Sequence, residues 1–249
     1  MLLSNWVGMG LGKCDSQMGI DFKESAILVI AGNGGIGSEL INLLVKIGSV
    51  RVYSTYRTTH PVNDEVQWIK FESENCEDYE KIISEISLKN RLILVIDASG
   101  AFFASPILKS TPEEITRVIN TNLTAPLTLA RACLKSMSPE GTLILFSSVI
   151  VESDIYGSSA YAASKMGLEK AITSLGEEFK RWGKGILGIR LGYMNYGMTF
   201  KIREDFREDI RAGLSNQKFE EIDGLLNLIL DLTSASSVKP FGDIVQYPG

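Results

Sequence analysis

Tyr161, Lys165 and Ser148 have the side-chain types and the spacing that proton transfer to an oxygen atom requires. Tyr161 and Lys165 are four residues apart, and Ser148 precedes Tyr161 by thirteen residues. Positions i and i+4 share one face of a helix, so this spacing predicts that both side chains reach one site. Tyrosine has a pKa of about 10, and we expect the neighbouring ammonium to lower it toward the working range. Ser148 can then hold the oxygen of a carbonyl or alcohol while Tyr161 gives or takes its proton.

A glycine-rich run far upstream predicts a dinucleotide site. Gly32, Gly34 and Gly37 form the pattern Gly-x-Gly-x-x-Gly between a buried-strand pattern and a helical pattern. In that context the first glycine allows a tight turn, the second lets a pyrophosphate approach the backbone, and the third lets helix and strand pack closely. A glycine-rich turn without a ligand would not account for the downstream tyrosine and lysine. The loop residues expected to contact the cofactor are Gly32, Asn33, Gly34, Gly35, Ile36 and Gly37.

The elements that must position these groups alternate between strand and helix. Strands are predicted at Ala26–Ala31, Val50–Thr55, Gln67–Phe71, Leu92–Asp97, Thr142–Ser147, Ile186–Leu191 and Asp243–Tyr247. Helices are predicted at Gly35–Ile47, Asp78–Leu88, from Thr111 onward, and at Ser158–Trp182, Lys201–Ala212 and Phe219–Leu232. The alternation predicts an α/β fold with a single doubly wound parallel sheet and helices on both faces. We expect an irregular leader at residues 1–21 and one domain at residues 22–249.

Composition narrows the class of protein further. The chain has 249 residues and a net charge of −5, and no Lys/Arg-rich run, so nucleic acid is not an expected partner. No apolar run reaches the roughly 18–20 residues of a membrane span, so no membrane partner is expected either. The three cysteines are widely spaced and odd in number, which favours reduced thiols in a cytoplasmic protein and no metal site.

The ordered set of motifs resembles the short-chain dehydrogenase/reductase family from about Ser25 to Gly249. Two stretches, Ala31–Gly37 and Val52–Arg57, are most similar to its C-factor-like branch. The pieces that occur in the family's order are the glycine loop, Asp97-Ala98-Ser99-Gly100, Asn122, Ser148, Tyr161, Lys165, Leu191-Gly192 and Pro248-Gly249.

The resemblance implies a Rossmann fold and a catalytic set of Asn122, Ser148, Tyr161 and Lys165. Tyr161 would transfer the proton, and Lys165 would lower its pKa and bond the nicotinamide ribose. Ser148, which the resemblance favours over Ser147, would orient the substrate oxygen. Asn122 would anchor a proton relay.

The predicted long helix that begins at Thr111 carries Asn122. Pro126 lies four residues after Asn122 and has no N–H, so it cannot donate to the Asn122 carbonyl. A water on that carbonyl could link to Lys165 and carry protons to solvent. Alternatively, Pro126 simply kinks the helix around the core, and the sequence leaves both interpretations open.

Cofactor choice depends on the end of the second predicted strand. An NAD enzyme usually has Asp or Glu there to bond the ribose 2′-hydroxyl, whereas this chain has Thr55 and Arg57 near that position. Arg57 can neutralise a 2′-phosphate, so we predict NADP(H). Through the resemblance, Ala98, Ser99 and Gly100 would form a wall against the cofactor, with Asp97 structural. The other residues expected to contact it are Tyr161, Lys165, Gly192, Met194 and Thr199.

The resulting prediction is an NADP(H)-dependent oxidoreductase that interconverts a carbonyl and an alcohol. The sequence does not define the small-molecule substrate, but several segments carry residues that could line an apolar or aromatic pocket. Two alternatives are a non-catalytic NADP(H)-binding sensor or signalling protein and a sugar-nucleotide epimerase or dehydratase, although little chain follows Lys165 to bind a sugar nucleotide. We expect a homodimer or homotetramer. The possible pocket residues are Phe102, Phe103, Val149, Ile150, Tyr156, Tyr193, Met194, Tyr196 and Met198.

Overall fold

A computed structural model describes residues 25–48, 50–71, 78–197, 204, 207–208, 219–234 and 239–247 of this chain. The leader expected at residues 1–21, Thr199, Met198 and most of the helix expected at Lys201–Ala212 lie outside these ranges. The division of the chain into a leader and one domain therefore stays a prediction.

Seven parallel strands form one sheet in the order β3-β2-β1-β4-β5-β6-β7. They are β1 (Ser25–Ile30), β2 (Arg51–Tyr56), β3 (Val66–Lys70), β4 (Arg91–Asp97), β5 (Thr142–Ser148), β6 (Gly185–Leu191) and β7 (Phe241–Tyr247). The order runs outward from β1 to β3 and resumes with β4 on the other side of β1. Ligands of doubly wound sheets bind at the carboxyl ends of the strands beside such a reversal. The predicted fold class is confirmed, and each predicted strand is present.

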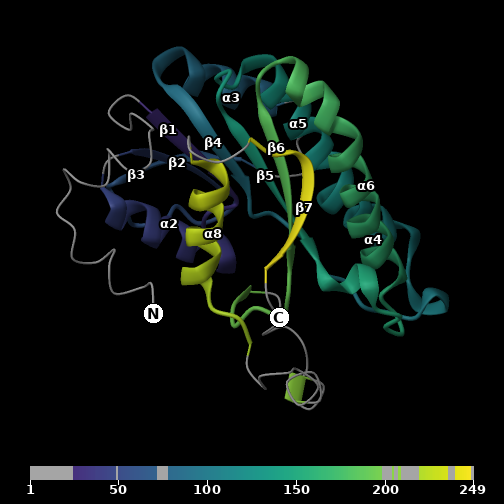
Figure 1. Cartoon of the computed structure of the whole chain (residues 1–249). Coiled ribbons are helices and arrows are strands. Elements are labelled where there is room, and N and C mark those ends of the chain that lie inside the picture. The colour runs from purple at the N-terminus through teal and green to yellow at the C-terminus, as the bar shows by residue number, and fades with distance from the viewer. Residues whose placement is uncertain are drawn as a thin grey trace.

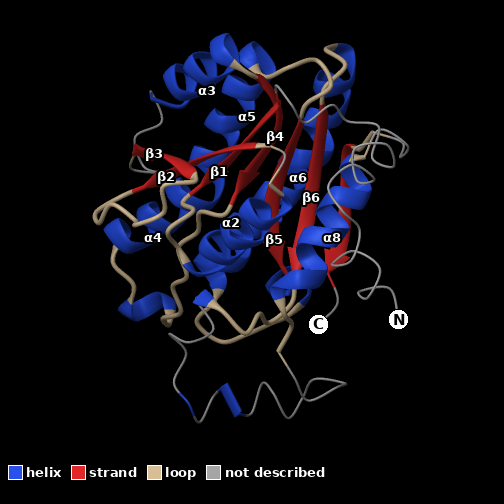
Figure 2. Cartoon of the chain, turned by 90° about the vertical axis from the view of Figure 1, so that its left-hand side faces the viewer, coloured by secondary structure: helices blue, strands red, loops and turns tan. Residues whose placement is uncertain are grey.

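Helices cover both faces of the sheet (Figures 1 and 2). One face carries α2 (Gly35–Ile47) and α8 (Ile222–Thr233), and the other carries α3 (Asp78–Lys89), α4 (Pro112–Ile119), α5 (Ala125–Ser136) and α6 (Ser159–Arg181). Within the ranges that the structure describes, no helix is long and apolar enough to cross a membrane.

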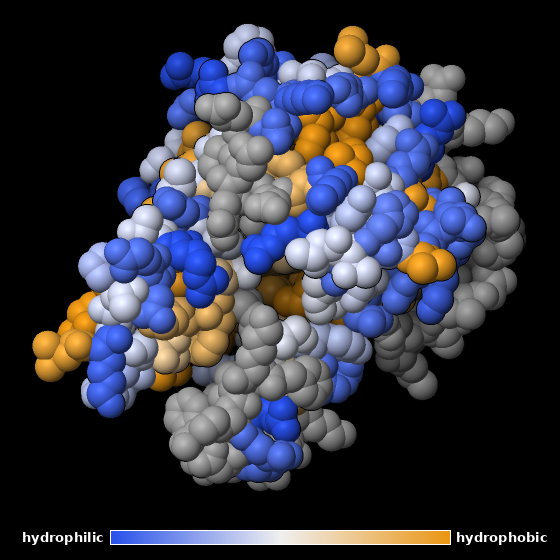
Figure 3. All heavy atoms as spheres, turned by 180° about the vertical axis from the view of Figure 1, so that it is seen from behind, coloured by the Kyte–Doolittle hydropathy of each residue, from blue (hydrophilic) through white to orange (hydrophobic). Residues whose placement is uncertain are grey.

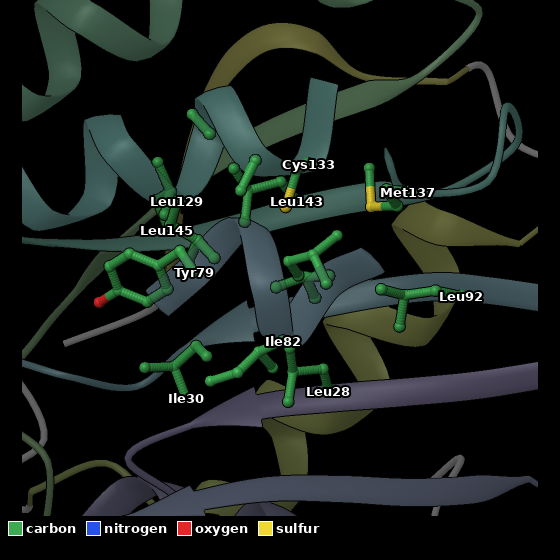
Figure 4. Packing of buried hydrophobic residues seen from close by; sticks show 14 of the residues in the cluster. Leu28, Ile30, Tyr79, Ile82, Leu92, Leu129, Cys133, Met137, Leu143 and Leu145 are labelled. Atoms are coloured by element: carbon green, nitrogen blue, oxygen red, sulfur yellow. The ribbon is translucent and has the colours of Figure 1, made fainter. Parts of the chain in front are cut away.

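Strand β1 shows why the sequence forms a central strand. Ile27 and Val29 pack in the cluster under α2 and α8, while Leu28 and Ile30 pack in the cluster under α3, α5 and α6. Successive side chains of a strand point to opposite faces, so a strand covered on both faces must be apolar throughout. Figure 4 shows the second cluster, in which Leu28 and Ile30 of β1 lie with Tyr79 and Ile82 of α3. On the face in Figure 3, hydrophobic residues form separate patches among hydrophilic ones.

Two helix ends follow directly from local sequence. Helix α2 has the predicted bounds and ends at Gly48, which adopts a left-handed conformation with φ 74°. Helix α4 begins with a capping box: the Glu114 backbone N–H donates to Thr111 Oγ1 at 3.2 Å, and the Thr111 N–H donates to Glu114 Oε2 at 2.9 Å.

The long helix predicted from Thr111 is not continuous. Helices α4 and α5 are joined by a π-helical turn at Asn120–Thr124, in which the Ala125 N–H donates to the Asn120 carbonyl. Pro126 has no N–H to donate to the Asn122 carbonyl, so the ordinary ladder of i→i+4 bonds cannot pass this point. Proline thus widens one turn of the helix just where Asn122 lies.

Candidate active site

Three of the predicted catalytic side chains meet at one pocket, Ser148 from the end of β5 and the other two from α6. Ser148, Tyr161 and Lys165 all line this pocket, which we call the reaction pocket. A second pocket lies along the glycine loop and the end of β2, and we call it the loop pocket. Ile36 and Ala98 line both, as does Ser99, so the two pockets form one groove across the switch point of the sheet.

The predicted cofactor residues are distributed over this groove. The loop pocket includes Asn33, Gly34, Gly35, Ile36, Thr55, Arg57, Ala98, Ser99 and Gly100. Gly192 and Met194 line the reaction pocket with Tyr161 and Lys165, and Thr199 lies outside the described residues. Gly32 and Gly37 line neither pocket and act by packing behind the loop.

The glycine loop differs from the expectation at its first turn. The residue in the left-handed conformation is Ala31, with φ 57°, rather than Gly32. A Cβ atom on Gly32 would lie 1.9 Å from Ser54 Oγ, so this glycine is required by close packing on β2. A Cβ atom on Gly37 would lie 2.5 Å from the Ala31 carbonyl oxygen, which confirms the predicted close approach of helix and strand.

Gly35 has a partner that the sequence pattern did not reveal. A Cβ atom on Gly35 would lie 2.4 Å from the Cα atom of Gly197, which follows β6. The start of α2 and the segment after β6 therefore touch through two glycine backbones. Both glycines line the loop pocket, so this contact forms part of its wall.

The end of β2 supports the loop from behind. Thr55 is buried, and its Oγ1 accepts a hydrogen bond of 2.7 Å from the Ala31 N–H. Ser54 Oγ donates to the Val29 carbonyl at 2.9 Å, which ties the same strand to β1. Arg57 follows at the rim of the loop pocket, and no carboxylate is among the described residues that line it.

Tyr161 is buried beside Ser148. Burial raises the pKa of Tyr161, while a hydrogen bond with the Ser148 side chain lowers it. The net direction is upward because desolvation of the phenolate outweighs this hydrogen bond, and the expected effect of Lys165 on the pKa of Tyr161 stays a prediction. The Phe102 ring packs edge-on against the Tyr161 ring, with 5.2 Å between the centroids.

Lys165 is also buried, and its side chain reaches from α6 to β5. Its Nζ donates to the Phe146 carbonyl at 2.8 Å. Burial lowers the pKa of Lys165 to about 8, and the negative charge of Asp97 acts in the opposite direction. Asp97 is held at the end of β4 by a 2.9 Å hydrogen bond from the Ser99 N–H. Asp97 is thus fixed in place, and its charge favours the protonated form of Lys165.

Asn122 does not line the reaction pocket but supports it. Its side chain bonds to both backbone groups of Ala101, in the segment after β4. Asn122 Nδ2 also donates to Ser164 Oγ at 3.1 Å, and Ser164 Oγ donates to the Tyr161 carbonyl at 2.7 Å. Sequence reasoning missed Ser164, although its place one turn from Tyr161 was a usable signal.

The rest of the reaction pocket is apolar and aromatic. Of the residues proposed from the sequence, Phe102, Ile150, Tyr156, Tyr193, Met194 and Tyr196 line it. Phe103 and Val149 are not among its lining residues, and Met198 lies outside the described part of the chain. Six further residues line the pocket that were not proposed from the sequence as pocket, cofactor or catalytic residues: Ala104, Phe146, Ser147, Ile155, Ser158 and Leu191.

Comparisons with known proteins agree with this geometry. The short chain dehydrogenase family matches residues 25–207. An acetoacetyl-CoA reductase of Synechocystis is 26% identical over 239 residues, covering 94% of this chain and 98% of its own. A 3-oxoacyl-[acyl-carrier-protein] reductase FabG of Rickettsia typhi is 30% identical over 199 residues, covering 77% and 81%. The structure of an actinorhodin polyketide ketoreductase with NADPH superposes with a TM-score of 0.81 at 17% identity, covering 91% and 96%.

The chain belongs to the short-chain dehydrogenase family and is an oxidoreductase. Its curated relatives are named reductases, and the solved structure shares its fold. These relatives do not single out the C-factor-like branch, which stays a prediction.

Proposed function

We propose that this protein is an NADP(H)-dependent reductase or dehydrogenase acting on a carbonyl/alcohol pair. The observation that carries the proposal is the groove itself. Ser148, Tyr161 and Lys165 lie in a pocket that is continuous with the glycine loop. A proton-transfer site and a dinucleotide loop in one groove are what hydride exchange between a cofactor and a carbonyl requires.

The start of α2 fits the phosphates of a dinucleotide. Gly34 is the N-cap residue, no side chain caps it, and the first turn of the helix has no acidic residue. Backbone N–H groups at a helix N-terminus attract anions. Gly34, Gly35 and Ile36 would hold the pyrophosphate, and Arg57 would pair with a ribose 2′-phosphate at the rim.

The chain's own residues would carry out the proton transfer. Ser148 and Tyr161 would bind the substrate oxygen, and Tyr161 would donate its proton to that oxygen during reduction. Lys165 would compensate the phenolate charge and bond the nicotinamide ribose. The cofactor, when bound, supplies the hydride that adds to the carbonyl carbon. The complete set supports catalysis over the non-catalytic sensor, and the curated relatives, which are named reductases, support a reductase over the sugar-nucleotide enzyme.

The walls of the reaction pocket support a substrate with an apolar or aromatic group beside the carbonyl. Lys165 is the one charged side chain among the described residues that line the pocket. Because the proposal assigns Lys165 to the tyrosine and the ribose, a charge on a substrate would have no other charged side chain to pair with there, and burying it would be costly. Acetoacetyl-CoA and 3-oxoacyl-[acyl-carrier-protein], which are named in the relatives, belong in the screen beside simple aryl and alkyl ketones.

The test is consumption of NADPH with a panel of carbonyl compounds, for the wild type and Tyr161→Phe. The variant removes one hydroxyl, so folding and NADPH binding should persist while turnover falls about 10²–10⁴-fold. Tyr156→Phe is the matched control, because Tyr156 lies at the same pocket but is 85% exposed. Turnover by Tyr161→Phe at the wild-type rate would show that another group donates the proton. Tight NADPH binding without turnover of any carbonyl or alcohol would favour the sensor.

A further inference from the structure

Arg190 connects three elements of the reaction pocket. It lies in β6, where its backbone pairs with Ser147 of β5. Its Nε donates to Glu169 Oε1 at 3.0 Å and its Nη2 donates to Glu169 Oε2 at 2.8 Å, so the pair is bidentate. Its remaining terminal nitrogen, Nη1, binds Glu152.

Each partner of Arg190 belongs to an element that carries a proposed catalytic residue. Glu169 lies one turn after Lys165 and two turns after Tyr161, and all three are buried on α6. Glu152 ends the short 3₁₀ turn Val149–Glu152, which follows Ser148 directly. One guanidinium therefore joins the segment after Ser148 to the helix face that carries the other two groups.

The two ion pairs of Arg190 differ in solvent exposure. The Glu169 side chain is 9% exposed and that of Arg190 19%, whereas the Glu152 side chain is 58% exposed. Burial alone would raise the pKa of Glu169, but hydrogen bonds from Arg190 and Ser147, together with the charge of Arg190, outweigh burial and the pKa is lowered. Buried ion pairs contribute little net stability compared with apolar residues of similar size. Their bidentate geometry does restrict orientation, and a lysine cannot reproduce it.

We propose that Arg190 is a positioning residue that holds Ser148 in register with Tyr161. The bidentate pair with Glu169 fixes the guanidinium on α6. The contact with Glu152 then holds the turn that follows Ser148. The proposal rests on the proposed function, because the distance between Ser148 and Tyr161 matters only if both side chains bind the same substrate oxygen. An error of about 1 Å in such a distance can reduce turnover about 100-fold.

The kinetic test uses Arg190→Lys, Glu152→Gln and the control Arg91→Lys. Arg91 starts β4 at the opposite end of the sheet, where it pairs with Glu140 at 3.6 Å. For both test variants we expect kcat to fall about tenfold or more, with KM for NADPH and the pH profile unchanged, since Tyr161 and Lys165 stay in place. Arg91→Lys should resemble the wild type. Wild-type kcat in both test variants would overturn the proposal.

A second measurement needs no substrate and distinguishes this proposal from the proposed function. Hydrogen exchange of residues 149–157 should be faster in Glu152→Gln than in the wild type, while the melting temperature stays the same because Glu152 is exposed. The same variant remains informative if Arg190→Lys fails to fold. Unchanged exchange in this segment would refute the positioning role, whereas absence of wild-type turnover with faster exchange would refute only the proposed function.

Discussion

Asn122 and Ala101 hold each other through two hydrogen bonds. Asn122 Nδ2 donates to the Ala101 carbonyl at 2.8 Å, and the Ala101 N–H donates to Asn122 Oδ1 at 2.9 Å. An amide side chain thus replaces a strand partner for the backbone after β4. The same segment continues to Phe102, which packs on Tyr161. The π turn that contains Asn122 therefore controls the position of one wall of the reaction pocket.

Replacing Asn122 should lower the free energy of unfolding more than replacing its exposed neighbour Asn120 does. Asn122→Ala leaves the buried backbone groups of Ala101 without partners, and we expect a loss of about 3 kcal/mol in the free energy of unfolding. Asn120→Ala in the same π turn is the control, because Asn120 is exposed. Urea unfolding of both variants measures the difference. Equal losses would mean that the Asn122 amide does not support the fold in this way.

The pH dependence of stability should carry a contribution from Lys165. Its pKa is lowered to about 8 in the folded protein, from an ordinary value of 10.5. Between these values the unfolded chain binds more protons at this site, so stability should rise with pH, by at most about 1.4 kcal/mol per pH unit. Below pH 8 the lysine is charged in both states and the penalty for burying its charge is complete.

The measurement compares urea unfolding of the wild type and Lys165→Met from pH 7 to pH 10. The difference in unfolding free energy between the two proteins should shift in favour of the wild type as the pH rises above 8. Other groups that titrate in this range cancel in the difference. A difference that stays constant with pH would show that Lys165 keeps its ordinary pKa.

NADPH should bind more tightly than NADH, and Arg57 should account for much of the preference. Arg57→Ala removes a charged donor to a 2′-phosphate, and we expect NADPH to bind about 10–100-fold more weakly while NADH is nearly unaffected. Lys70→Ala is the control, because Lys70 pairs with Tyr56 at the same end of the sheet but does not line the loop pocket. Titration calorimetry of the wild type and both variants with NADPH and with NADH measures these affinities. Equal affinity of the wild type for NADPH and NADH would contradict the assignment.

We expect the protein to form a homodimer or homotetramer through α5 and α6. Leu129, Ala130 and Ala132 of α5 are buried, whereas Leu127 of α5 is 37% exposed and Met166 of α6 is 50% exposed. These two helices pack together, and each exposes an apolar side chain that a second copy could cover.

Light scattering at micromolar concentration measures the oligomeric state. The wild type should exceed the monomer mass of 27.4 kDa, and Leu127→Glu with Met166→Glu should shift it toward that mass. Leu88→Glu is the control, because Leu88 is 85% exposed on α3. A monomeric wild type would contradict the prediction.

Local sequence determined most of the strands and helices and their alternation along the chain. The bounds of α2, the capping box at Thr111 and the apolar strands follow from short-range hydrogen bonds and from the alternation of side chains, which neighbouring residues specify. The spacing of Tyr161 and Lys165 likewise predicted one helix face, and both side chains line the reaction pocket.

Tertiary structure alone decided how residues from different elements meet. Gly32 is required by Ser54 of β2 rather than by its own turn, and Asn122 supports Ala101 instead of lining the reaction pocket. The pairing of Arg190 with Glu169 across two elements leaves no pattern in the sequence. The raised pKa of Tyr161 depends on burial, which the whole packed domain creates. Contacts and desolvation of this kind join residues far apart in the chain, so no local pattern encodes them.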